Sequence, residues 1–142
     1  MAAQADAKKQ HFIATHRFAR ISARKARYVI DLIRGLPVEK AITDLRYCLK
    51  RGGPMISKVL KSAVANATQA AGLEAGKLYV AVAEVGDGPR FKRFKPRAMG
   101  RAYPRQKRTC HIRVAVREIA EGSSQMNPGL KIRRKVKKTA VS

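Results

Sequence analysis

A cationic stretch between two strand-like segments constrains the fold of this chain more than any other feature of its sequence. Residues 90–108 contain nine Lys and Arg and no acid, and they show neither a helical stripe nor an apolar run. Residues 78–83 before the stretch and 112–117 after it alternate as the two faces of a strand do. Because a structureless loop of this length is unusual in a compact domain, we expect both strands to continue outward as one long hairpin at about 86–110.

The predicted hairpin would need external anions to hold it, because an isolated two-stranded hairpin is marginal in water and its like charges repel one another. An arm of about ten to twelve residues would reach roughly 35 Å beyond the domain at ~3.3 Å per residue. We expect its tip near Ala98–Gly100, where Gly100 can adopt a positive φ. Pro96 and Pro104 cannot donate ladder hydrogen bonds, so pairing is expected to be interrupted or one-sided there.

The charge of the whole chain favours a polyanionic partner. Its 142 residues, enough for one domain, include 32 Lys and Arg against 9 Asp and Glu, a formal net charge of +23. RNA, DNA and an anionic membrane are the candidates. Residues 28–88 are nearly neutral, whereas residues 1–27 and 89–142 are strongly basic. No stretch approaches the ~20 apolar residues of a membrane helix, and no signal or transit peptide is recognisable. We therefore expect a cytoplasmic protein without a membrane partner.

The residue types in the cationic stretch suit folded RNA. Arg offers a planar fork for phosphate or guanine contacts and can stack on bases, whereas Lys offers a point charge. Phe91, Phe94 and Tyr103 lie among the cations. These rings either stack on unpaired bases or form cross-strand pairs that steady the hairpin, and both interpretations stay open.

Three helices are predicted ahead of the strands. Ser22 is the expected N-cap of the first helix, with its hydroxyl accepting a hydrogen bond from a helix N–H, and Gly35 is the expected stop. The second helix is expected to begin near Pro37, and the third covers roughly residues 54–71. The apolar stripe predicted for the second helix comprises Val38, Ala41, Ile42, Leu45, Cys48 and Leu49.

These elements predict an α+β fold: a small two-layer domain of three helices on an antiparallel sheet, with a long protruding β-hairpin. Residues 12–20 are expected to form either a short first strand or an extended lead-in. Leu78, Val80 and Val82 are expected to share the apolar face of their strand.

The chain is predicted to have two ends outside this domain. Residues 1–11 are expected to be a disordered extension, residues 12–118 the domain with its hairpin, and residues 119–142 a basic tail that orders only on RNA. A nuclear-localisation signal is the alternative for the basic run at residues 131–138.

Nothing in the sequence argues for an enzyme, a cofactor, a metal or a small-molecule substrate. The chain has no glycine-rich nucleotide loop, no Cys/His cluster and no Ser/His/Asp constellation. His111 borders a predicted strand and is expected to contact RNA or the hairpin base. Cys48 and Cys110 are too few for a disulfide framework or a zinc site, so we expect two reduced, packed thiols.

Three segments, in this order and spacing, carry a resemblance to a known family. They read SARKARYVIDLIRG, KVLKSAVANA and GPRFKRFKPRAMGRAYPRQKRTCHIRVAV. With the PRAxGRA core at residues 96–102, they closely resemble the bacterial large-subunit ribosomal protein twenty-two family over roughly residues 12–118.

The resemblance implies a structural constituent of the large ribosomal subunit, with the domain outside and the hairpin lining the peptide exit tunnel near the macrolide site. It also implies a role in early assembly. The implied partners are the large-subunit rRNA, neighbouring large-subunit proteins and the nascent polypeptide. The predicted rRNA and tunnel contacts of the hairpin are Arg90, Lys92, Arg93, Lys95, Arg97, Met99, Gly100, Arg101, Arg105, Lys107, Arg108 and His111. The predicted rRNA contacts at the globular base are Arg17, Arg20, Ser22, Arg24, Lys25 and Arg27.

The sequence departs from the family pattern in three places. The Tyr103-Pro104 pair puts a proline in the return arm, Phe91 and Phe94 stand where the family varies, and the tail after Glu118 extends past the usual end.

Two other function classes share some of these features. A DNA-compacting protein would share the charge, but such proteins usually rely on dimerisation or groove-reading helices, and the helices here are predicted to face the core. A nucleic-acid-processing enzyme is disfavoured by the missing catalytic site.

Overall fold

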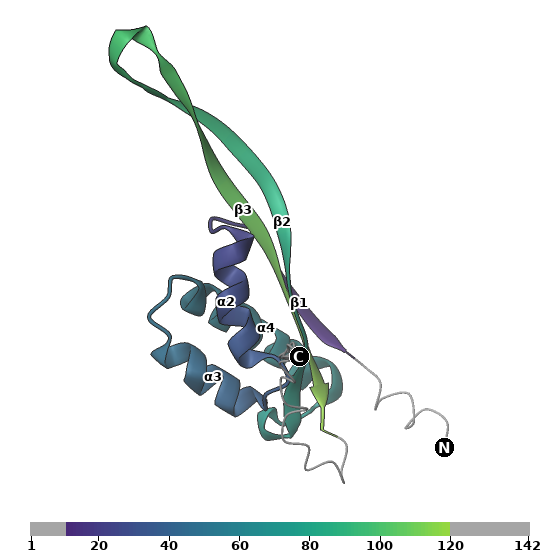
Figure 1. The fold of residues 1–142 in the computed structure, drawn as a ribbon. Helices are drawn as coiled ribbons and strands as arrows, with labels where there is room; N and C mark the ends of the chain where they lie inside the picture. The colour runs from purple at the N-terminus through teal and green to yellow at the C-terminus, as the bar shows by residue number, and fades with distance from the viewer. Residues whose placement is uncertain (1–10, 120–142) are drawn as a thin grey trace, which may run out of the picture.

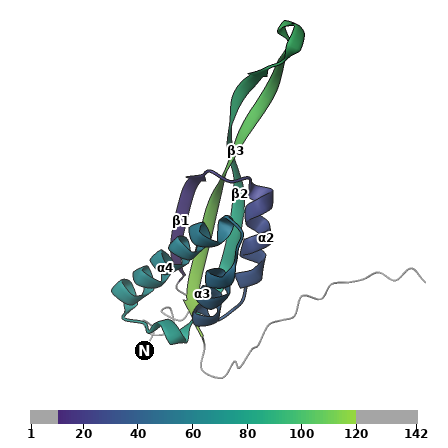
Figure 2. The same cartoon turned by 90° about the vertical axis from the view of Figure 1, so that its left-hand side faces the viewer.

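The computed structural model describes residues 11–119 of the chain. Its elements are β1 (Phe12–Ala19), α2 (Ala23–Ile33), α3 (Val38–Tyr47), α4 (Gly52–Ala71), the short helix η1 (Ala75–Lys77), β2 (Leu78–Pro96), the short helix η2 (Ala98–Gly100) and β3 (Ala102–Glu118). The strands form one antiparallel sheet in the order β1-β3-β2, and the three longer helices cover one face of it (Figures 1 and 2). The predicted α+β class is confirmed, and β1 is a strand rather than an extended lead-in.

The predicted ends of the chain lie outside the described residues, apart from His11 and Ile119. The disordered extension and the basic tail therefore stay predictions.

α2 forms because its apolar residues recur at helical spacing, which lets one face pack on the sheet. The residues at this spacing are fully buried: Ala26, Val29, Ile30 and Ile33. Ser22 occupies the N-cap position, but its hydroxyl makes no cap hydrogen bond, so the position was predicted correctly and the bond was not. Gly35 adopts a φ of +74° just after the helix, which confirms it as the stop.

A tight turn between α3 and α4 shifts both predicted boundaries. α3 ends at Tyr47, because Cys48 takes an extended conformation with φ −73° and ψ 108°. Leu49 is fully exposed, so the prediction that it continues the apolar stripe is wrong. α4 already begins at Gly52, and a Cβ on Gly53 would lie 3.1 Å from the carbonyl oxygen of Cys48. A side chain at position 53 would therefore crowd the backbone of the turn, which favours glycine there.

A bulge at Ala81 changes which side chains of β2 face the core. Val80 and Val82 pair with consecutive residues of β3, so Ala81 is an extra residue. Beyond it Ala83 is buried, whereas Val82 is only partly buried. The predicted apolar face is therefore wrong at Val82, because one extra residue exchanges the two faces of a strand.

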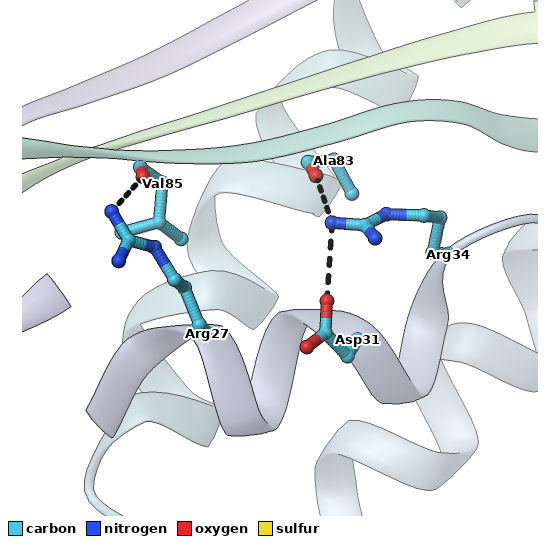
Figure 3. A network of polar contacts seen from close by, with 5 residues as sticks. All are labelled: Arg27, Asp31, Arg34, Ala83 and Val85. Carbon is cyan, nitrogen blue, oxygen red and sulfur yellow. Dashed lines mark hydrogen bonds and ion pairs between the residues drawn. The ribbon is translucent and has the colours of Figure 1, made fainter. Parts of the chain in front are cut away.

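α2 and Arg34, which directly follows it, cover the outer edge of β2, where carbonyl groups would otherwise be unpaired. Arg34 donates from Nη2 to the carbonyl oxygen of Ala83 at 2.9 Å, and Arg27 donates from Nη2 to that of Val85 at 3.2 Å (Figure 3). The Asp31 carboxylate lies 3.1 Å from the Arg34 guanidinium. These contacts fix α2 against the part of β2 from which the hairpin departs.

Burial stops where the hairpin leaves the helices. Cys110 and Ile112 are fully buried and Thr109 is 4% exposed, whereas every residue of the cationic stretch 90–108 is exposed. We call residues 90–108 the arm and the rest of the described chain the body. Figure 1 shows the arm extending well past α2. The fold therefore joins a packed body to an arm without a core.

Candidate nucleic-acid interface

The arm keeps a continuous register through its prolines. β2 and β3 stay paired from Arg90 opposite Arg108 to Pro96 opposite Ala102, and Pro104 lies within that run. The alternative that pairing is interrupted at the prolines is therefore wrong. Pairing is one-sided at these positions, because proline has no N–H to donate.

Like charges face each other across the arm. Arg90 lies opposite Arg108, and Arg93 lies opposite Arg105, an arrangement that destabilises an isolated hairpin. The arm contains nine basic residues and no acid, so no internal ion pair offsets the repulsion. The charge of the arm can only be neutralised by anions from outside it.

Both faces of the arm carry cations, because side chains alternate along each strand. Arg93 and Lys95 lie on one face of β2, and Lys92 lies on the other with Arg90. An element that rests on the surface of a polyanion needs positive charge on one face only. Two cationic faces suit an arm that a folded polyanion surrounds.

The tip closes at the predicted place. Met99 has φ 61° and ψ 33° and is 90% exposed, and Gly100 follows with φ 67°. Below them Arg97 donates its backbone N–H to the carbonyl oxygen of Arg101 at 2.8 Å. The Arg97 guanidinium carbon lies 5.8 Å from the centre of the Tyr103 ring, so a cation and a ring are stacked just behind the tip.

The three aromatic rings of the arm do not face one another. The residues opposite them are Lys107 for Phe91, Pro104 for Phe94 and Lys95 for Tyr103. Phe94 is 78% exposed, whereas Phe91 is 49% exposed. The rings gain little from each other, which weakens the cross-strand interpretation, and stacking on bases stays a prediction.

A second bulge marks the root of the arm. Between Asp87 and Arg90 β2 advances three residues while β3 advances two, so β2 carries an extra residue that bends it. Thr109 donates its hydroxyl to the carbonyl oxygen of Pro89 at 2.7 Å. A Cβ on Gly88 would lie 2.6 Å from the same Thr109 hydroxyl oxygen. The direction in which the arm leaves the body therefore depends on a glycine.

Both cysteines are free thiols, as predicted. Cys110 is fully buried at the root of the arm. Burial raises the pKa of its thiol and the nearby Asp87 carboxylate adds to this effect, while Arg27 opposes it. The Cys110 thiol therefore stays protonated and acts as a small apolar side chain.

His111 steadies a third irregularity, in β1 beside the root. Its Nδ1 accepts a hydrogen bond from the backbone N–H of Phe18 at 3.1 Å, and the two rings meet edge-on with centroids 4.9 Å apart. Phe18 has φ 58°, which a bulky residue seldom adopts. The structure thus gives His111 a contact at the hairpin base, the structural alternative that the sequence left open.

The residues predicted at the globular base gather beside the root. Arg17 lies in β1, Arg20 and Ser22 lie in the following turn, and Arg24, Lys25 and Arg27 lie in α2. All are exposed except the half-buried Ser22. Arg27 is partly engaged by the protein, since its guanidinium also lies 3.7 Å from the Asp87 carboxylate. Contacts of these residues with rRNA stay predictions.

A groove of about 720 Å³ lies between part of this base and the root of the arm, and Arg20, Ser22 and Lys25 are the predicted base residues that line it. Its cationic side chains come from both sides: Arg20, Lys25, Arg51, Arg93, Lys107 and Arg108. Phe91, Gln106 and Ser22 also line it. Neither Arg51 nor Gln106 was predicted as a site residue. Only the folded chain brings Arg51, in the turn before α4, beside the arm, and Gln106 is the uncharged member of a cationic stretch.

Two other kinds of site are absent from residues 11–119. No group of three or more His, Cys, Asp or Glu in this range could hold a metal ion. No helix in the same range is long and apolar enough to cross a membrane.

Comparison with known proteins decides the family. A family model described as ribosomal protein L22p/L17e matches residues 14–117. The chain belongs to this family. It is 53% identical over 105 residues to the large ribosomal subunit protein uL22 of Lacticaseibacillus casei, covering 74% of this chain and 90% of that protein. It is 50% identical over 106 residues to the uL22 of Maridesulfovibrio salexigens, a match that covers 75% of this chain and 96% of that protein.

Membership of the L22p/L17e family confirms the resemblance found in the sequence. The chain is a ribosomal protein, and it is not an enzyme. The match ends at residue 117, so it includes the whole arm and leaves the basic tail outside.

Proposed function

We propose that this L22p/L17e protein is a structural component of the large ribosomal subunit that binds the large-subunit rRNA through its arm and globular base. The observation that carries the proposal is the arm itself, with nine cations, no acid and every residue exposed. RNA surrounding the arm would supply the anions that its facing arginines require. The base residues beside the root extend the same positive surface onto the body.

The arm has the shape to pass between rRNA segments and to reach the peptide exit tunnel. It is only two strands wide, and it carries cations on both faces. In this proposal the tip residue Met99 faces the tunnel near the macrolide site, while Arg97 and Arg101 hold the rRNA wall behind it. Neighbouring large-subunit proteins would contact the body, and early binding to rRNA would support subunit assembly.

Sedimentation of a lysate from growing cells tests the proposal. The protein should co-migrate with the large subunit and stay with it at moderate salt. A protein found mainly outside the large-subunit fraction would refute the proposal. Co-sedimentation with DNA would instead support the alternative that this is a DNA-compacting protein.

A photo-crosslinking residue at position 99 tests the tunnel contact separately. In stalled ribosomes it should crosslink to the nascent chain, whereas the same residue at exposed position 47 on the body should not. Equal crosslinking from both positions, or from neither, would refute placement of the tip in the tunnel.

A further inference from the structure

The geometry points to a specific site for unpaired RNA in the groove at the root of the arm, with one extruded base stacked on Phe91. This inference rests on the proposed function and makes it more specific. The rest of the arm is an open, cationic surface, whereas the groove is a concave site with three kinds of contact. Each kind matches a different part of a nucleotide.

The groove supplies cations for phosphates from both of its walls. Arg20, Lys25 and Arg51 belong to the body, and Lys107 and Arg108 belong to the arm. Arg is able to grip a phosphate with two parallel hydrogen bonds. A strand that lies in the groove would therefore be held on both sides of its backbone.

Phe91 supplies a flat apolar surface inside the groove. It is 49% exposed, compared with 78% for Phe94 three residues farther out, which does not line the groove. A half-covered ring among cations is suited to stack on a base, and unpaired bases stack on aromatic side chains in most sequence-specific RNA complexes. Of the three aromatic rings of the arm, Phe91 is therefore the one that offers an exposed surface for stacking and also lines the groove.

The edge of β3 supplies polar groups for the rim of the base. β1 makes its last pair at Ala19 opposite Cys110, so within residues 11–119 β3 has no strand paired to it on that side from Thr109 outward. Thr109, Lys107 and Gln106 all line the groove. Backbone groups on this open edge and the Gln106 amide can hydrogen-bond a base edge.

The size of the groove favours single-stranded RNA. A volume of about 720 Å³ falls in the range of sites for small ligands, which leaves room for one or two nucleotides but not for a duplex. RNA duplexes also hide their base faces by stacking. The groove should therefore select a bulge, a loop or an end.

Two RNA probes and a matched pair of variants of the full chain test this site. The probes are a sixteen-base-pair duplex and the same duplex with a three-nucleotide bulge. The wild-type protein should bind the bulged probe about 5- to 150-fold more tightly, the range expected for stacking of one base. Phe91→Leu should abolish this preference without changing the salt dependence, whereas Phe94→Leu should retain it.

A second pair of variants tests the body wall of the groove. Arg51→Gln should lower the salt dependence of binding to the bulged probe by about 0.7 log units, as expected for one lost phosphate contact on a single strand. Lys58→Gln, an exposed cation of α4 outside the groove, should leave it unchanged. Equal effects of Phe91→Leu and Phe94→Leu, or no preference for the bulge, would overturn the inference.

The same measurements distinguish failure of the groove from failure of the proposed function. If binding to large-subunit rRNA keeps its steep salt dependence while the bulge preference is absent, only the groove inference fails. If rRNA binding itself is weak and insensitive to salt, the proposed function fails with it.

Discussion

The body and the arm of this protein belong to one chain but owe their shapes to different forces. In the body, side chains such as Leu60, Ile112 and Val114 are fully buried, and burial of apolar surface stabilises the fold. In the arm, every residue is exposed and arginines face arginines, so backbone pairing acts against charge repulsion. The body is therefore specified by its own interior, whereas the shape of the arm depends on backbone pairing alone unless anions from outside offset its charge.

Removal of charge from the arm should give the largest effect, and it should change binding rather than folding. Alanine at Lys92, Arg93, Arg97 and Arg101 should lower the salt slope of rRNA binding by about 3, at 0.7–0.9 per contact. At about 0.1 M salt this corresponds to a thousandfold loss of affinity, or about 4 kcal/mol. Filter binding over a salt series measures the slope, and urea unfolding should show an unchanged body.

Four exposed cations of the body serve as the matched control for these arm variants. Alanine should be placed at Lys40, Arg46, Lys58 and Lys61 of α3 and α4. We expect these substitutions to change the salt slope of rRNA binding much less than the four arm substitutions do. Equal slopes for the two quadruple variants would mean that charge acts uniformly over the protein, and the contrast between arm and body would be lost.

A cavity in the body should give the next largest effect, on stability. Leu60→Ala removes a fully buried side chain of α4 and should lower the free energy of unfolding by about 2–5 kcal/mol. Phe94→Ala, at an exposed site on the arm, should change it by less than about 0.5 kcal/mol. Urea denaturation measures both. A large loss for Phe94→Ala would reveal that the arm contributes to the folded core.

A methyl group at the root should affect both regions at once. Gly88→Ala places a Cβ 2.6 Å from the Thr109 hydroxyl and 3.2 Å from the backbone nitrogen of Cys110, so the bulge must shift, at a cost of about 1–3 kcal/mol. Gly86→Ala is the control, because its Cβ would meet only the His111 Cβ at 4.0 Å. Gly88→Ala should lower both the melting temperature and the affinity for rRNA, whereas Gly86→Ala should change neither. If Gly88→Ala changes neither quantity, the root can accommodate the added methyl group.

Loss of the His111 contact should give the smallest of these effects. His111→Ala removes the acceptor for the Phe18 N–H and the ring contact, and should lower the free energy of unfolding by about 1–2 kcal/mol. His111→Asn offers a carbonyl oxygen as a new acceptor and should recover about half of the loss. Hydrogen exchange at the Phe18 amide reports the bond directly. Identical exchange in the wild type and His111→Ala would rule out this role.

The sequence predicted the elements whose signals are local. Helical spacing located α2, and the charge of residues 90–108 located the arm with its tip at Gly100. The bulge at Ala81 was missed because both faces of this segment are apolar, so alternation alone could not reveal a change of phase. The end of α3 at Tyr47 was missed because the apolar spacing continues through Cys48 and Leu49, while the close packing of Gly53 against Cys48 in the turn is visible only in the fold.

Most of the cations of the candidate site were predictable from the sequence, but Arg51 and the shape of the groove were not. The cations of the arm and of the base were all visible in the sequence. Their meeting in a groove depends on β1 ending its pairing at Ala19 and on the turn that carries Arg51. Such long-range geometry leaves no periodic signal in the chain.

If the arm moves relative to the body, the bulge at Gly88 is the natural pivot, because pairing shifts register there and the backbone is closely packed against Thr109. From this pivot the tip lies about a dozen residues away, or up to roughly 35 Å at ~3.3 Å per residue. A rotation of about 10° at this point would move the tip by about 6 Å, somewhat more than the ~4.8 Å between neighbouring strands. Small changes in the packing of Thr109 against Pro89 would therefore be magnified into large displacements of the tip.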